Sequence, residues 1–210
     1  MTFTPGQQTH VDTMRAVLAS VRDTQLVLKG GTALLLCYGL DRFSEDLDFD
    51  APKKFNLESR LEQAVRSLAQ SVRLIRTKDT DTAQRYRIEY VVGGTEGRLK
   101  VEVSCRDAID PGDVVEREGI RTYRAARLVE QKIAALEGRT AARDLYDVHF
   151  LVKNFRAEFG EESAGRLRNA AANLNGIEAR FRPAFEEDDL FRHQAGLLPA
   201  MILEIQEALA

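Results

Sequence analysis

The hydrophobic pattern of the chain changes character once along its 210 residues. In the first part, apolar residues at helical spacing predict helices over residues 11–21 and 57–68. Short apolar or alternating runs predict strands over residues 26–28, 46–50, 72–75, 86–92 and 99–103. The later part is almost entirely helical in pattern, with helices predicted over residues 124–136, 142–153, 162–173, 177–185 and 197–208.

The turn-rich run Asp110-Pro111-Gly112-Asp113 separates these two patterns. A chain of 210 residues is long enough for two small units, each with a hydrophobic core of its own. We therefore expect an α+β fold. Residues 1–112 should form a mixed sheet with flanking helices, and residues 113–210 a helical unit, with an active site in the cleft between them.

The composition is that of a globular protein, with 44% hydrophobic and 30% charged residues, which disfavours a disordered chain or a simple coiled coil. No run approaches the roughly 20 apolar residues that span a bilayer. The start of the chain, MTFTPGQQTH, lacks the basic flank and apolar segment of a secretion signal. These features predict a cytoplasmic protein that has no membrane partner.

The residues that bind soft metals are scattered along the chain. Cys37 and Cys105 lack paired spacing, and His10, His149 and His193 do not cluster. This distribution disfavours a zinc or iron site and leaves oxygen ligands, which bind hard cations. We expect Mg²⁺, with Mn²⁺ as an alternative.

A glycine turn near the N-terminus is a candidate phosphate site. Gly30 and Gly31 stop the first predicted strand, and Thr32 is expected to cap a helix over residues 33–40. The free backbone N–H groups at such a helix start attract anions. We expect Gly30, Gly31 and Thr32 to bind the β and γ phosphates of a nucleotide.

Two acids on one strand are the candidate metal ligands. In Asp46-Leu47-Asp48-Phe49, acidic and apolar residues alternate, so Asp46 and Asp48 point the same way, about 6–7 Å apart at Cα. Such a pair can share two metal ions about 3.5–4 Å apart. One ion would activate the attacking hydroxyl, and the other would hold the triphosphate and its leaving pyrophosphate.

A third carboxylate is expected on the ion that activates the hydroxyl. Glu102 lies between Val101 and Val103 on a predicted strand and is the first candidate, with Glu89 ranked second. Taken alone, Glu102 is best interpreted as a residue on the solvent-facing side of its strand. The nearby pair of aspartates favours its interpretation as a metal ligand.

Other polar and charged residues near the two aspartates have interpretations that involve no metal ion. Asp41, Glu45 and Asp50 are expected to be surface charges. For Arg42 and Ser44, contact with the nucleotide and a solvated loop are equally plausible.

These motifs resemble a known family. The glycine turn followed by Asp46-Leu47-Asp48-Phe49 resembles the signature of polymerase-beta-type nucleotidyltransferases. The runs KGGTAL and RFSEDLDF are similar, more specifically, to the AbiEii/AbiGii toxin family of bacterial abortive-infection and toxin–antitoxin systems. A later block agrees with this resemblance and consists of Gln131 to Leu136, Arg139 and Arg143 to Val148.

The resemblance implies roles for the later block. Lys132 would reach the phosphates of the nucleotide, and Arg139 or Arg143 would add positive charge. Asp144 and Asp147 lie three apart on one helical face, where they would orient Lys132, bind the nucleotide or act as a base. From the residues alone, Lys132 reads as a solvated lysine, and Asp144 as a helix-start charge paired with Arg143.

The family also implies an activity. We expect transfer of a nucleoside monophosphate from an NTP to an RNA, the 3′ end of a tRNA, by a toxin that a cognate antitoxin restrains. Net charge is −3, but residues 117–143 are rich in arginine and would contact the RNA backbone or serve the NTP alone. The alternatives are nucleotidylylation of a protein, nucleotidyl transfer to a small molecule, and a non-catalytic nucleotide-sensing module.

Overall fold

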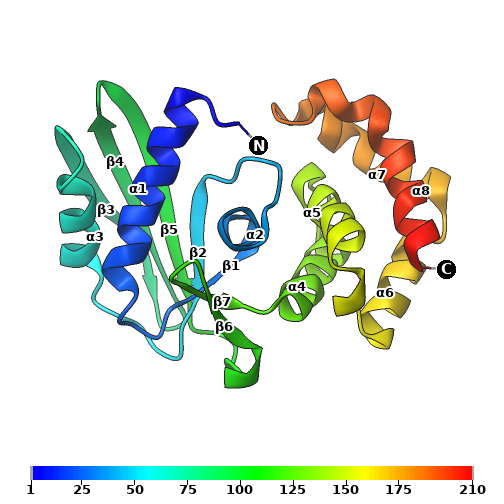
Figure 1. The fold of residues 1–210 in the computed structure, drawn as a ribbon, viewed down its shortest axis with the longest axis horizontal. Helices are drawn as coiled ribbons and strands as arrows, with labels where there is room; N and C mark the ends of the chain where they lie inside the picture. The colour runs from blue at the N-terminus through cyan, green and yellow to red at the C-terminus, as the bar shows by residue number, and fades with distance from the viewer. Residues whose placement is uncertain (1, 210) are drawn as a thin grey trace. The chain divides into compact units, whose positions relative to one another are not determined.

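The computed structural model describes residues 2–209, which form two compact units (Figure 1). The first unit ends at Arg124 and the second begins at Ala125. The first contains a mixed sheet with helices and the second is helical, so the predicted α+β fold class is confirmed. Across the described residues, no helix is both long and apolar enough to cross a membrane.

The first unit is built on a seven-stranded sheet within the described residues. Its strands are β1 (Val27–Lys29), β2 (Asp46–Asp50), β3 (Ser71–Thr80), β4 (Ala83–Val92), β5 (Thr95–Ser104), β6 (Val114–Arg117) and β7 (Ile120–Tyr123). They are ordered β3-β4-β5-β2-β1-β7-β6. The sheet is mixed, because β2 is parallel to β5 and antiparallel to β1.

The strands β6 and β7 were not predicted from the sequence. They form a hairpin whose turn residues, Glu118 and Gly119, both have positive φ, at 52° and 72°. Two residues of this kind are typical of the turns that match the twist of paired strands. Because β7 pairs with β1, the first unit extends beyond the expected division after residue 112.

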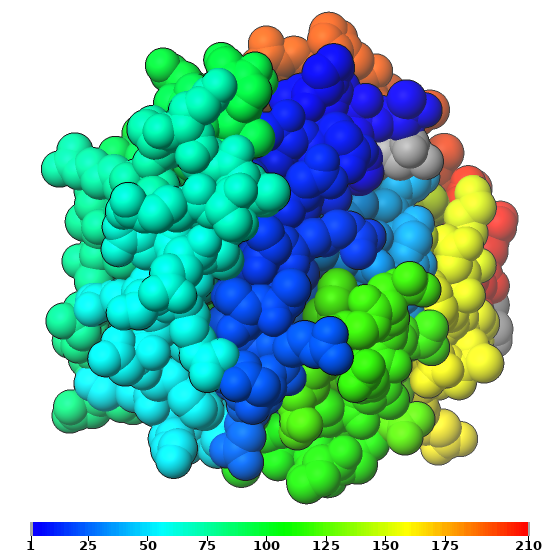
Figure 2. All heavy atoms as spheres, turned by 60° about the vertical axis from the view of Figure 1, so that its left-hand side comes forward, coloured from blue at the N-terminus to red at the C-terminus, as the bar shows by residue number. Residues whose placement is uncertain are grey.

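Among the residues described, the first unit has three α-helices, namely α1 (Pro5–Val21), α2 (Gly30–Tyr38) and α3 (Glu58–Arg66). Helix α1 begins earlier than predicted because Thr4 and Gln7 form a capping box, with Pro5 in the first turn. Helices α1 and α3 lie side by side (Figure 2) and contact β5 and β3. Helix α2 packs against β1, β2 and β7 (Figure 1).

The sheet has one apolar and one polar face along β2, β5 and β4. Leu47 on β2 is in register with Val101 on β5, and Val101 with Tyr86 on β4, and all three are fully buried. Successive side chains of a strand alternate between faces. Asp46 and Asp48 therefore share the opposite face.

The second unit consists of α4 (Ala125–Gly138), α5 (Ala142–Asn154), α6 (Glu161–Ala171), α7 (Leu174–Glu187) and α8 (Leu198–Leu209). Apolar positions of all five helices meet in one core, which includes Leu128, Leu145, Leu167, Phe181 and Ile202. These helices match the predicted ones to within a few residues, because amphipathic spacing is a local signal.

Candidate active site

Three carboxylates lie on the polar face of the sheet. Asp46 and Asp48 come from β2, and Glu102 comes from β5. Asp48 is in register with Glu102, and Asp46 with Lys100, across the parallel β2–β5 pair. Neighbouring strands are about 4.8 Å apart, so Asp48 and Glu102 are direct neighbours. The structure thus brings together the three acids that the sequence proposes as metal ligands.

The pKa values at this cluster show how its charges are balanced. Burial raises the pKa of Asp48, and the charges of Asp46 and Glu102 raise it further, against the lowering effect of Lys100. Burial also acts to raise the pKa of Glu102, but the hydrogen bond and charge of Arg85 outweigh it and hold that pKa below its usual value. Asp48 is therefore less readily ionised than Glu102.

Two basic side chains form ion pairs with Asp46 and Glu102, the acids on either side of Asp48. Lys100 Nζ lies 2.7 Å from Asp46 Oδ2, and Arg85 Nε lies 2.9 Å from Glu102 Oε2. Within residues 2–209, no three Asp, Glu, His or Cys side chains are already grouped to hold a metal ion. The carboxylate oxygens suit Mg²⁺ in their chemistry. For all three to act as ligands, Asp46 and Glu102 would have to exchange Lys100 and Arg85 for the ion.

The glycine turn lies directly beside these acids. Helix α2 begins at Gly30, whose φ is +76°, and a Cβ at this position would lie 3.5 Å from Asp48 Oδ2. Lys29 is the N-cap and forms no side-chain capping hydrogen bond. The turn therefore presents backbone N–H groups next to Asp48, as an anion site requires.

The side chain of Thr32 forms hydrogen bonds within the first unit. Its hydroxyl lies 2.5 Å from the carbonyl oxygen of Asp46, to which it donates, and 2.9 Å from Ser44 Oγ. The prediction that Thr32 caps the helix is wrong, because the helix starts two residues earlier and Thr32 is 1% exposed. The hydroxyl ties α2 to the start of β2.

Arg42 and Ser44 are buried, so the solvated-loop interpretation is wrong. A Cβ on Gly31 would lie 2.7 Å from Arg42 Nη2 and 3.0 Å from Ser44 Oγ. Arg42 also donates from Nη1 to the Phe43 carbonyl at 3.0 Å. The segment before β2 therefore packs directly onto the glycine turn, which only tertiary packing reveals.

Gly31→Ala is expected to displace Arg42 and Ser44 and to weaken NTP binding by at least about tenfold. The added methyl group meets buried polar atoms at distances that force the neighbours to shift, and overpacking costs about 1–3 kcal/mol. Calorimetric titration with a non-hydrolysable NTP measures the effect. Gly138→Ala is the matched control, because a Cβ there meets nothing within 4 Å. Equal affinities for both variants would contradict the prediction.

Of the remaining acids near the turn, Asp41 and Glu45 are exposed, as predicted. The prediction of a surface charge is wrong for Asp50, which is 3% exposed. Lys29 Nζ lies 2.5 Å from its Oδ1, and Tyr123 donates to its Oδ2 at 2.9 Å. Asp50 thus links β2 to β7, one of the strands that the sequence did not indicate.

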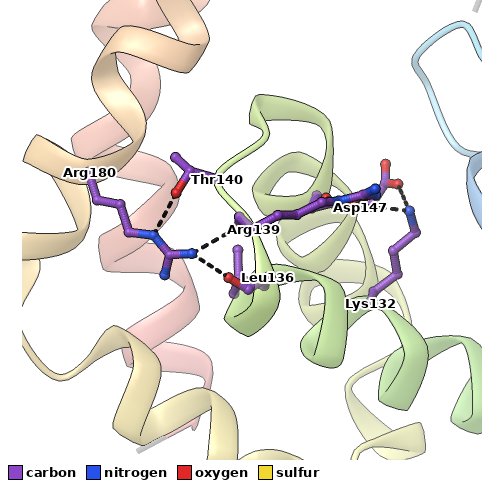
Figure 3. A network of polar contacts seen from close by, with 7 residues as sticks. Lys132, Leu136, Arg139, Thr140, Asp147 and Arg180 are labelled. Carbon is purple, nitrogen blue, oxygen red and sulfur yellow. Dashed lines mark hydrogen bonds and ion pairs between the residues drawn. The ribbon is translucent and has the colours of Figure 1, made fainter.

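The later motif forms a compact polar network inside the second unit (Figure 3). Lys132 on α4 places its Nζ 2.6 Å from Asp147 Oδ2 and 3.4 Å from Asp144 Oδ1, both on α5. Arg139 Nε donates to Asp144 Oδ2 at 2.6 Å. All these groups except Arg139 are buried, so the interpretation of Lys132 as a solvated lysine is wrong.

Asp144 remains ionised in this network. Burial acts to raise its pKa, but the hydrogen bond from Arg139 and the charge of Lys132 outweigh burial and hold the pKa below its usual value. Arg143 pairs with Asp188, with 3.3 Å between Nε and Oδ2. Lys132, Arg139, Asp144 and Asp147 therefore meet at one place, while Arg143 contacts α7's C-terminal end.

Arg180 on α7 is a residue of this network that the sequence did not indicate (Figure 3). Its Nη2 donates to the carbonyl oxygens of Leu136 and Arg139 at 2.9 and 2.8 Å. Its Nε donates to Thr140 Oγ1 at 2.9 Å. Arg180 thereby fixes the turn between α4 and α5 that carries Arg139.

Two solved structures closely resemble the chain. The "Crystal structure of JHP933 from Helicobacter pylori" is 34% identical, with a TM-score of 0.91, and the match covers 99% of this chain and 92% of that one. The "Crystal structure of putative nucleotidyltransferase from H. pylori" is 35% identical, with a TM-score of 0.90, and the match covers 99% and 94%. No curated protein gives a significant match.

A family model that covers most of the chain identifies it as a nucleotidyltransferase. The family model described as "Nucleotidyl transferase AbiEii toxin, Type IV TA system" matches residues 12–208. The chain belongs to this AbiEii family of nucleotidyltransferase toxins from type IV toxin–antitoxin systems. The family and the general activity of a nucleotidyltransferase, both predicted from the sequence motifs, are confirmed.

Proposed function

We propose that the chain transfers a nucleoside monophosphate from an NTP to an RNA, the 3′ end of a tRNA, and releases pyrophosphate. The observation that carries this proposal is the position of Asp46, Asp48 and Glu102 on one sheet face, beside the start of α2 at Gly30. A nucleotide whose phosphates meet that helix start would place its reacting phosphate near the carboxylates.

The proposal includes a divalent metal, two Mg²⁺ ions or Mn²⁺ in their place, held by Asp46, Asp48 and Glu102. When bound, such ions neutralise phosphate charge and make a hydroxyl a better nucleophile. Until then, Arg85 and Lys100 would balance the charges of Glu102 and Asp46 through their ion pairs. Gly30, Gly31, Thr32 and Ser44 would position the triphosphate.

In the second unit, we propose that Lys132 binds nucleotide phosphates, with Arg139 and Arg143 adding positive charge. Asp144 and Asp147 hold the ammonium group of Lys132 between them. These two acids would thereby orient Lys132 toward its ligand, and one of them would accept a proton if the lysine moves away. Biologically, we propose a cytoplasmic toxin that a cognate antitoxin protein or regulator restrains.

The test is incubation of the purified protein with each α-³²P-labelled NTP, Mg²⁺ and total tRNA, followed by mass spectrometry of RNA and protein. We expect added nucleotides at tRNA 3′ ends, and none with Asp46→Asn. Label on protein instead would identify protein nucleotidylylation, and label on a small molecule would identify a third acceptor class. Binding of NTP without any turnover would identify a nucleotide-sensing module.

A further inference from the structure

The polar face of the sheet carries a row of cations beyond the three carboxylates. Strand register places Arg85 beside Glu102, Arg87 beside Lys100, and Arg98 beside Glu89. On the edge strand β3, Arg73 is in register with Glu89, and Lys78 with Arg85. Residues in register across paired strands share a face. We name this set, Arg73, Lys78, Arg85, Arg87, Arg98 and Lys100, the basic face.

The far end of the basic face has more positive than negative charge. Glu89 is shared by three arginines, whose nitrogens lie 3.1 Å (Arg87), 3.9 Å (Arg73) and 4.0 Å (Arg98) from its carboxylate oxygens. One carboxylate balances one guanidinium, so positive charge remains even when the nearby Glu96 is counted. The side chains of Arg73 and Arg98 are 76% and 70% exposed.

The surface at this place is hollowed. An open hollow of about 660 Å³ is lined by Arg73, Glu89, Glu96 and Arg98 together with neighbouring residues of β3, β4 and β5. The helices α1 and α3 contact the sheet where its buried apolar side chains lie. The hollow and its arginines are therefore open to a ligand.

By contrast, the arginine-rich run over residues 117–143 is largely engaged within the protein. Arg127 pairs with Glu130, Arg139 with Asp144, and Arg143 with Asp188. Lys132 is buried between Asp144 and Asp147. Arg117 lies over the ring of Tyr38, 4.5 Å from its centroid. These contacts offset part of the positive charge of the run.

We propose that the basic face binds the phosphate backbone of the 3′ end of the RNA acceptor and leads its terminal hydroxyl to Asp46 and Asp48. The inference rests on the proposed function. Arginine suits phosphate oxygens because its planar donors bind them in pairs. From β2 to β3 there are three strand spacings, about 14 Å in all.

The test measures RNA binding without NTP, so it does not depend on turnover. A fluorescein-labelled single-stranded 12-nucleotide RNA is titrated with wild type, Arg73→Gln/Arg98→Gln and the control Arg60→Gln between 50 and 200 mM KCl. Arg60 lies on α3 and pairs with Asp23, with a side chain 45% exposed, so the control also removes an exposed arginine. Circular dichroism confirms that the variants fold.

We expect the double variant to bind the RNA about 10- to 30-fold more weakly at 100 mM KCl. Its slope of log affinity against log salt should be shallower by about 1.4, because each lost phosphate contact on a single strand removes about 0.7. The control should match the wild type. Equal slopes for all three proteins would overturn the proposal, as would displacement of the RNA by polyglutamate at equal charge, which would indicate an acidic protein partner.

The outcomes separate this inference from the proposed function. If RNA binds through Arg73 and Arg98 but receives no nucleotide in the labelling test, the proposed function is wrong while the basic face stands. If tRNA is labelled equally well by the wild type and by Arg73→Gln/Arg98→Gln at limiting tRNA, the basic face is wrong while the proposed function stands.

Discussion

Asp48→Asn is expected to lower nucleotide transfer by at least about 100-fold without destabilising the protein. Removing a residue that only hydrogen-bonds to a metal ligand lowers metal affinity or activity about 10–100-fold. Removing the ligand itself should therefore lower activity by at least the upper end of that range. The raised pKa of Asp48 means that the folded protein holds the ionised carboxylate unfavourably. Replacing this charge with an amide of the same shape removes that penalty.

The effect on stability has a definite pH dependence. Because the pKa of Asp48 is raised in the folded state, its ionisation destabilises the fold as pH rises above the ordinary value of 3.8 and through the raised one. Below that window the carboxyl is neutral in both states. Urea unfolding should show Asp48→Asn as stable as the wild type at about pH 3 or below, and more stable at pH 7.

Magnesium provides a second measurement that does not depend on turnover. A ligand that binds only the folded state at 100 times its Kd stabilises it by about 2.7 kcal/mol. Thermal unfolding of the wild type should shift upward with saturating Mg²⁺ and NTP, and that of Asp48→Asn should not. Asp23→Asn, which changes an exposed carboxylate of α1's C-terminal loop, is the control. Full turnover by Asp48→Asn would contradict the metal site.

The parts of the site that the sequence predicts correctly are local. Asp46 and Asp48 must share a face because they lie two apart on one strand, whatever surrounds that strand. Gly30 similarly marks the end of β1 through its own backbone conformation, with φ +76°. The position of Glu102 beside Asp48 required the pairing of β2 with β5, for which the sequence offered only an alternating pattern.

The parts that the sequence missed depend on contacts between distant segments. The sequence predicts Asp50 to be a surface charge, but in the fold β7 places Tyr123 within hydrogen-bond distance of it. For Arg42 the sequence left a solvated loop and contact with the nucleotide equally open, and only the fold shows that Arg42 packs against Gly31, which has no side chain. Arg180 is about 40 residues from the turn that it fixes. In each case a polar residue is buried because its partner comes from elsewhere, and hydropathy patterns contain no such information.

Asp147→Ala is expected to lower the free energy of unfolding by about 3–5 kcal/mol, because it leaves the buried ammonium of Lys132 without its nearest carboxylate. The side chain of Asp147 is fully buried, and that of Lys132 is 10% exposed. Asp144 is a poor substitute, since it lies 3.4 Å from Nζ and already binds Arg139. Urea unfolding of the full chain measures the loss.

The matched control is Glu137→Ala, which breaks the ion pair with Arg166 in the same unit. Both of those side chains are more than a third exposed, so the expected loss is below about 1 kcal/mol. Equal losses for Asp147→Ala and Glu137→Ala would mean that burial does not govern the Lys132 network.

The double variant Lys132→Met/Asp147→Leu separates the structural role of this pair from its proposed role in binding phosphate. Replacing a buried ion pair with apolar residues of similar volume is often neutral or stabilising, so the double variant should unfold near the wild-type urea concentration. If Lys132 binds the nucleotide, turnover should nevertheless remain at least about 100-fold below wild type, as for loss of other charge-stabilising donors. Recovery of both stability and turnover would assign the pair to folding alone.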